Sequence, residues 1–363
     1  MSRSLRAAGV VLAMSWVAFL RVGAAADPFR GADPAWNLIH EPAVERELRL
    51  SPAQQREFRG LLGELDAGLF PLRNRPAAEA DAGARNTLAT LERRLERLLS
   101  AAQMRRWAEI QVRRQGTAAL LRPGLAAAMH YTPRQREQLE QVITDTLQAT
   151  QELERRAADG EERRPLEQRY AALQKAEWDA VSGILSAGQQ SLWRKACGRD
   201  FDLTALGHAR FKPPELVDSG TWLNSDPLTL ESLDGKVVVL HFYACGCINC
   251  IRNQPTYAAW QERYRDQDVV ILGIHTPETA AEQDPAHVRE QAAAAGLGFP
   301  VLIDGAQANW NAWGNSMWPS VYLIDKQGYL RHFWPGELKW QGATGDRWMQ
   351  DRIDALLAEP AAP

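Results

Sequence analysis

The chain has 363 residues, with 42 Lys+Arg against 45 Asp+Glu, and this length accommodates two domains that each bury a core. The near balance of charge excludes a broad basic surface for nucleic acid. Three of the four cysteines lie within residues 245–250, which excludes a stabilising disulfide framework, because a framework spreads its cysteines along the chain. The clustering of these cysteines indicates a reactive site instead of a structural role.

The first 26 residues have the order of a secretory signal peptide. Two arginines precede an apolar run from Ala7 to Leu20, and small residues follow before Asp27, which predicts cleavage after Ala26. The alternative is an uncleaved anchor, but a run of this length makes only about 21 Å of helix against a hydrocarbon core of roughly 30 Å. We therefore expect a periplasmic or otherwise extracytoplasmic protein.

Residues 27–206 are rich in Ala, Leu, Arg, Glu and Gln, a composition that predicts an all-helical domain. A Ser or Thr followed three residues later by Gln is a capping box that marks a helix start, and it occurs at Ser51, Ser100, Thr132 and Ser186. A large apolar residue follows each Gln by four positions, which predicts core anchors at Phe58, Trp107, Leu139 and Trp193. Pro42 and Pro123 precede the first and third boxes by the same interval, so we expect an internal duplication of a helical hairpin.

The spacing of these boxes resembles the LTxxQ pattern of Spy/CpxP-type periplasmic proteins, which are helical and include chaperones. Ser replaces Thr in three boxes, and Tyr131 replaces Leu in one. Any helix start can carry a capping box, so duplicated structural helices are the alternative interpretation.

Helical periodicity ends before a short linker, 207–213, and the Pro213–Pro214 pair prevents a helix from continuing. Alternating apolar runs and helix-forming runs follow, and they predict an α/β domain at 214–363 with a central sheet covered on both faces. The expected elements are strands at 236–243, 269–274 and 300–303, helices after Cys247 and at 285–296, a hairpin of 320–324 and 329–333, and a helix at 346–358.

Cys247 and Cys250 lie where the first of these strands turns into a helix. A sulfur at the positive end of a helix is favoured as thiolate, the form that attacks a disulfide. A second sulfur one turn later can then close on the first and release the partner, so the pair predicts dithiol–disulfide exchange. A static disulfide and a metal site of Cys245, Cys247 and Cys250 are the alternatives. The domain shows no obvious second ligand pair, so we expect neither a metal nor another cofactor.

Four motifs in this domain, CINCIRNQP, GIHTPE, WPSVYLID and HFWPGE, resemble those of the TlpA/ResA group of thioredoxin-fold redoxins. The resemblance is closest to the extracytoplasmic domain of DipZ-type proteins. It implies a thioredoxin-like fold, a redox-active Cys247–Cys250 disulfide, protein disulfides as substrates and a membrane electron donor of the CcdA/DsbD type. The balanced charge gives no reason to expect a nucleic-acid partner, and the oligomeric state stays open.

The resemblance also assigns positions around the dithiol. Pro255 matches the proline that kinks the family's active-site helix, and Pro319 matches its cis-proline, which lies against the dithiol. Trp318 would contact substrate at this edge, with ordinary packing as the alternative. His275 and Glu278 belong to the HTPE motif, whose loop gathers beside the dithiol, and Glu278 is a candidate substrate contact.

Two residues depart from the family pattern. His241 occupies the position of the family's buried acid, where a neutral imidazole can serve as general base for Cys250. The alternative is a strand histidine satisfied by hydrogen bonds. Cys245 is a third exchanging thiol, a partner for Cys197, or a small buried residue.

These observations predict an exported thiol–disulfide oxidoreductase with Cys247 as nucleophile and Cys250 as resolving thiol. One alternative is a thiol peroxidase, although the peroxidatic Thr and Pro are absent from 241–244. The other is a non-catalytic periplasmic chaperone or binding protein that acts through the helical domain. In the oxidoreductase, residues 27–206 are expected to hold a partner or client near Cys247, with dimerisation or envelope anchoring as the alternative. The direction of electron flow is open.

Overall fold

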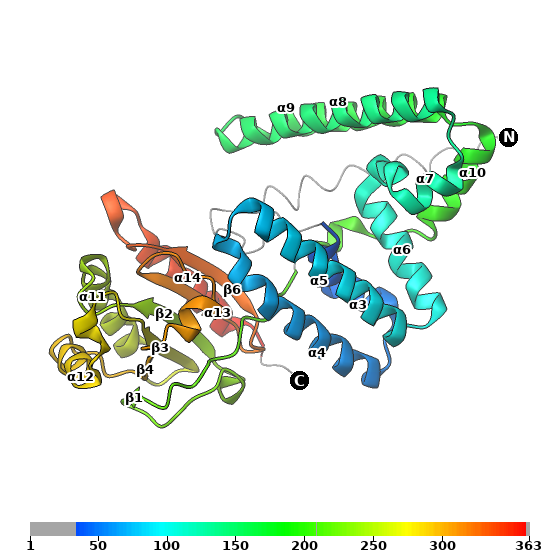
Figure 1. Ribbon diagram of the computed structural model, residues 1–363. Helices are drawn as coiled ribbons and strands as arrows, with labels where there is room; N and C mark the ends of the chain where they lie inside the picture. The colour runs from blue at the N-terminus through cyan, green and yellow to red at the C-terminus, as the bar shows by residue number, and fades with distance from the viewer. Residues whose placement is uncertain (1–33, 208, 361–363) are drawn as a thin grey trace. The chain divides into compact units, whose positions relative to one another are not determined.

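The computed structural model describes residues 34–207 and 209–360, so the expected signal peptide lies outside the described residues (Figure 1). The chain forms two compact units. One consists of Pro34–Ser51 and Leu95–Ala209, and the other of Pro52–Arg94 and residues 210–360. In the part of the chain that the structure describes, no helix combines the length and the apolar character needed to cross a bilayer.

The first unit is helical, and three of its helices begin where the capping boxes predict. Ser100, Thr132 and Ser186 each accept a hydrogen bond from the backbone N–H of the Gln three residues later, and each Gln side chain accepts one in return. Two long helices, α8 and α9, run side by side as a hairpin (Figure 1). The helices are α2 (Pro34–Ile39), α3 (Pro42–Leu48), α6 (Ala101–Gln115), α7 (Pro123–Met129), α8 (Pro133–Ala158), α9 (Arg163–Ile184) and α10 (Ala187–Cys197).

Two corners of this unit share one pattern of hydrogen bonds, and the duplication of a helical hairpin stays a prediction. The short helices α3 and α7 both end at a residue with left-handed backbone geometry. Gln103 donates from Nε2 to the carbonyl of Leu48 at 3.1 Å, and Gln189 donates in the same way to Met129 at 3.0 Å. Gln103 and Gln189 therefore each satisfy a free carbonyl at the end of a preceding short helix. The same junction, a short helix end bonded by a capping Gln, therefore occurs twice.

The second unit contains a six-stranded sheet in the order β1-β4-β3-β2-β5-β6. β2, β3 and β4 are parallel, whereas β1, β5 and β6 are antiparallel to their neighbours, so the predicted α/β class is confirmed. The sequence analysis did not predict β1 or α13, which have only 2 and 5 residues. The bounds are β1 (Trp222–Leu223), β2 (Val237–Tyr243), α11 (Ile248–Arg263), β3 (Val269–His275), α12 (Pro285–Ala294), β4 (Val301–Ile303), α13 (Ala308–Ala312), β5 (Ser320–Ile324), β6 (Leu330–Pro335) and α14 (Gly345–Ala358).

One face of the sheet forms the core beneath the dithiol. Alternate residues of β2, including Val239 and Tyr243, pack against Tyr257 and Trp260 of α11 and against buried residues of α14. Successive strand residues point to opposite faces, so Phe242 lies on the other side. There it meets Trp313 at a ring-centroid distance of 5.7 Å.

The domain boundary differs from the expected one, because residues 52–94 belong to the unit that contains the sheet. This segment holds α4 (Pro52–Leu69), the short helix η1 (Phe70–Asn74) and most of α5 (Ala77–Leu98). The expected helical domain, 27–206, is therefore divided between the two units.

Aromatic packing within the second unit accounts for this division. Phe70 is fully buried and meets the ring of Trp313 edge-on at 5.8 Å. Arg73 donates to the carbonyl of Trp313 at 2.6 Å and to the hydroxyl of Tyr322 at 2.5 Å. Its guanidinium also lies 5.0 Å from the ring centroid of Phe333, which is within cation–π range. These contacts join η1 to the sheet face opposite α11.

Candidate dithiol site

Cys247 lies where the buried strand β2 gives way to α11. It is the N-cap residue of that helix, with extended backbone angles of φ −72° and ψ 117°. Its side chain is 9% exposed, whereas Cys250, one turn into the helix, is 1% exposed. Both cysteines are therefore buried, with Cys247 at the start of the helix and Cys250 one turn further in.

The two thiols differ in acidity. The pKa of Cys247 is lowered to about 6, chiefly because the Cys250 thiol donates a hydrogen bond to its sulfur. The backbone N–H groups of Cys250 and Asn249 also lower this pKa, whereas burial acts in the opposite direction. Burial raises the pKa of Cys250 far above its usual value. At neutral pH, Cys247 is therefore the thiolate and Cys250 carries the proton.

Pro319 lies beside the dithiol loop through strand pairing. The Trp318–Pro319 peptide bond is cis, as the resemblance implied. Ser320 pairs with Phe242, so Pro319 comes next to the end of β2 that leads into the dithiol loop. Trp318 is half-buried and stacks on Trp310 at 4.1 Å, which shows a packing role and leaves substrate contact as a prediction.

Glu278 is exposed and lies close to both sulfurs. Its negative charge acts to raise the pKa of both Cys247 and Cys250. The loop is held there because Thr276 donates from its backbone N–H to the carbonyl of Tyr243 at 2.9 Å. The predicted gathering of the HTPE loop beside the dithiol is therefore observed, and substrate contact by Glu278 stays a prediction.

His241 is 1% exposed and is surrounded by aromatic rings. It stacks on Tyr257 at 4.0 Å and meets Phe299 edge-on at 5.2 Å. Neither ring nitrogen has a hydrogen-bond partner among the described residues. Burial lowers the pKa of His241 to about 3, so the imidazole is neutral in the folded protein and a much weaker base than free histidine. Its predicted role in proton transfer stays a proposal.

Two tyrosines near Cys250 were missed by the sequence analysis. Burial raises the pKa of both Tyr243 and Tyr257, and both side chains lie close enough to Cys250 to interact with it electrostatically. Tyr257 accepts a hydrogen bond from Asn253 at 3.2 Å. For Tyr243 the sequence did hold a signal. Side chains alternate between the two faces of β2, which places residues 239, 241 and 243 on the face that α11 covers.

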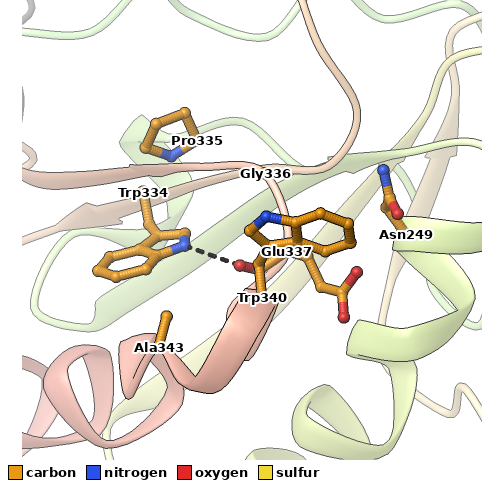
Figure 2. Close-up of a pocket in the computed structure, with 7 residues that line it drawn as sticks. All are labelled: Asn249, Trp334, Pro335, Gly336, Glu337, Trp340 and Ala343. Atoms are coloured by element: carbon orange, nitrogen blue, oxygen red, sulfur yellow. Dashed lines mark hydrogen bonds between the residues drawn. The ribbon is translucent and has the colours of Figure 1, made fainter.

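A pocket of about 360 Å³ opens beside the CINC segment (Figure 2). Asn249, between the two cysteines, forms part of its wall, and the indole of Trp334 donates to the carbonyl of Glu337 at 3.4 Å. The HFWPGE motif, noted in the sequence without a role, thus forms a partly aromatic surface near Cys247. The lining residues are Asn249, Trp334, Pro335, Gly336, Glu337, Trp340 and Ala343.

Comparison with known proteins shows which class of protein this domain belongs to. Residues 216–333 match the AhpC/TSA family. The thiol-disulfide oxidoreductase YkuV of Bacillus subtilis is 31% identical over 147 residues, which cover 40% of this chain and 94% of YkuV. A thioredoxin-like protein solved in its oxidised form is 30% identical, with a TM-score of 0.37, and the match covers 41% of this chain and 96% of that one. The fold and the relatives define a thioredoxin-like oxidoreductase domain.

The chain belongs to the thioredoxin-like AhpC/TSA family through this domain. Protein DipZ of Mycobacterium tuberculosis is 41% identical over 127 residues, and so is DipZ of Mycobacterium bovis. That match covers 34% of this chain but only 18% of DipZ, so the chain spans less than a fifth of these relatives. The predicted resemblance to the TlpA/ResA/DipZ type of redoxin is confirmed for the C-terminal part.

Proposed function

We propose that the protein is a thiol–disulfide oxidoreductase that exchanges electrons with protein disulfides through Cys247 and Cys250. The observation that carries the proposal is the placement of the two sulfurs, one at the N-cap of α11 and the other buried one turn later. The similarity to the thiol-disulfide oxidoreductase YkuV, which the match covers almost entirely, supports the same chemistry.

The reduction of a client follows from this placement. The Cys247 thiolate attacks one sulfur of the client disulfide, forming a mixed disulfide and releasing the other client sulfur as a thiolate that takes a proton. Cys250 then loses its proton and attacks the sulfur of Cys247, which forms the Cys247–Cys250 disulfide and releases the second client thiolate. The client gains two electrons and the protein loses two. An external dithiol reductant restores the starting state, and the reverse sequence oxidises a client.

The test is reduction of insulin by the full chain with dithiothreitol as the electron source. Cys247→Ser should abolish the protein-dependent rate, and Cys250→Ser should accumulate a mixed disulfide visible on a non-reducing gel. Cys197→Ser is the matched control and should retain activity, because Cys197 lies in the other unit. Full activity of the Cys247→Ser protein would refute the proposal. Consumption of hydrogen peroxide with no reduction of insulin would favour the peroxidase instead.

The site of action and the electron donor belong to the same proposal. We infer export from residues 1–26 and a membrane donor of the CcdA/DsbD type from the redoxin resemblance. Mature protein recovered from the extracytoplasmic fraction should begin at Asp27. A mature chain that retains Met1 in the cytoplasm would contradict this part of the proposal and leave the dithiol chemistry in place.

A further inference from the structure

A second group of reactive side chains lies behind the dithiol loop and takes no part in the exchange just described. Cys245 follows β2, His275 ends β3, and Glu282 lies in the short helix η5 (Ala280–Gln283). Their candidate ligand atoms all lie within 4.8 Å of one another. The three residues are 7%, 0% and 3% exposed, so the group lies below the protein surface.

His275 makes no hydrogen bond to the other members of this group, although the charge of Glu282 acts on it. It is fully buried, and neither of its ring nitrogens has a hydrogen-bond partner among the described residues. Leaving a buried polar group unsatisfied costs about 1–3 kcal/mol, so native structures normally supply a partner. A bound cation beside Cys245 and Glu282 would supply one.

Glu282 is already oriented as a ligand would be. Its Oε1 accepts the backbone N–H of Gly246 at 2.8 Å, and its Oε2 accepts that of Glu278 at 2.7 Å. A carboxylate has roughly four lone-pair sites, so both oxygens keep acceptor capacity toward a metal. Gly246 permits the approach, because a Cβ at this position would lie 2.5 Å from Oε1. Hydrogen bonds of this kind orient the ligands of metal sites.

We propose that Cys245, His275 and Glu282 bind one zinc ion. One sulfur, one imidazole nitrogen and one carboxylate oxygen are the donor types that Zn²⁺ takes, whereas Mg²⁺ and Ca²⁺ take oxygen ligands. Ligand atoms at about 2.0–2.3 Å from a tetrahedral ion lie roughly 3.3–3.8 Å apart, so the group needs to close by about 1 Å. Three protein ligands leave a fourth position for water.

A zinc ion at this site would have two effects. It would tie the dithiol loop to the loop after β3, in addition to the bonds through Glu282. It would also occupy the sulfur of Cys245, which is two residues from Cys247 and would otherwise be available for a wrong disulfide. Zinc has no redox chemistry and would not draw electrons from the dithiol. This inference does not depend on the proposed exchange activity. The metal set considered from the sequence, which used Cys247 and Cys250, differs from this one.

The test is zinc binding by the reduced full chain after removal of metals with EDTA, measured by competition with a chromophoric chelator. One equivalent should bind per chain. Cys245→Ala should weaken binding by at least about 100-fold, and Glu282→Gln should weaken it by at least about 10-fold. The Cys247→Ser/Cys250→Ser double variant and Cys197→Ser should each still bind one equivalent.

Cobalt offers a second readout that a folding defect does not imitate. The wild-type chain with Co²⁺ should show a thiolate-to-metal charge-transfer band that Cys245→Ser lacks and that His275→Ala alters, while the far-ultraviolet circular dichroism of both variants matches wild type. Less than one-tenth of an equivalent of zinc on the wild-type chain would overturn the proposal. Equal binding by wild type and Cys245→Ala would also overturn it, as would loss of binding confined to the Cys247/Cys250 variant.

Discussion

Replacing His241 by phenylalanine tests how deeply this residue is buried. The imidazole stacks on Tyr257 at 4.0 Å, and Gly273 in β3 leaves room for it, since a Cβ there would lie 3.3 Å from Nε2. A phenyl ring has a similar shape and no nitrogen to leave unsatisfied. We therefore expect His241→Phe to be at least as stable as wild type near pH 7.5.

The magnitude follows from proton binding by the folded and unfolded chains. The pKa of His241 is about 3 in the folded protein against an ordinary value of 6.5. Between these values the unfolded chain binds a proton that the folded chain excludes, so the free energy of unfolding falls as the pH falls through this window. Each pH unit costs about 1.4 kcal/mol. At pH 5 the wild type should have lost about 2 kcal/mol through His241 alone, a loss that His241→Phe should not show.

Urea denaturation at pH 7.5 and pH 5, followed by tryptophan fluorescence, measures this difference. Other titrating groups, including the buried His275, are present in both proteins and cancel in the comparison. Ile353→Val is the matched control, because it trims a buried residue of the same core without removing a ring contact of His241 or a titrating group, and its stability deficit should be equal at the two pH values. An equal loss of stability by wild type and His241→Phe would show that His241 is not held neutral by burial.

Further changes test the packing and the dithiol. Phe70→Ala should lower the free energy of unfolding of the second unit by about 3–5 kcal/mol, because a fully buried ring is removed. A change below about 1 kcal/mol in urea denaturation would contradict the packing of η1 on the sheet. In EDTA-treated protein, alkylation of Cys247 by iodoacetamide should be half-maximal near pH 6. Glu278→Gln should shift this midpoint downward, because the Glu278 carboxylate raises the pKa of Cys247. An upward shift would show that Glu278 does not act on the Cys247 sulfur. His241→Ala should lengthen the lifetime of the mixed disulfide without unfolding the chain, and unchanged turnover from pH 5 to 9 would leave His241 a packing residue.

Delivery of clients by the helical residues 27–206 is a proposal that deletion cannot test cleanly. Removing them would also remove Phe70 and Arg73, which pack on Trp313 within the second unit. Any loss of activity would then include a loss of structure. Insulin and a small aromatic disulfide should instead be compared on the full chain carrying Leu147→Lys, a change at an exposed apolar residue of α8. Client delivery through this face predicts slower reduction of insulin alone, whereas equal rates would exclude it.

Local chemistry in the sequence determined much of this protein. The Ser or Thr and Gln of each capping box lie three residues apart, so their mutual hydrogen bonds depend on one helical turn and little else. The position of Cys247 at the start of α11 is equally local, because a strand-forming run and a helix-forming run flank it. The sheet elements were also found to within a few residues, since burial on one face leaves a periodic trace in the chain.

Only the tertiary structure decided which segments pack together and which side chains are buried away from solvent. Phe70 lies within residues 27–206, which the sequence assigns to the helical domain, but its burial against Trp313 assigns its segment to the sheet-containing unit. The low pKa of His241 comes from rings contributed by Tyr257 and Phe299, far from it in the chain. Cys245, His275 and Glu282 come together because the parallel strands β2 and β3 end side by side. Desolvation and convergence of this kind depend on neighbours brought by the fold, and periodicity along one chain carries no record of them.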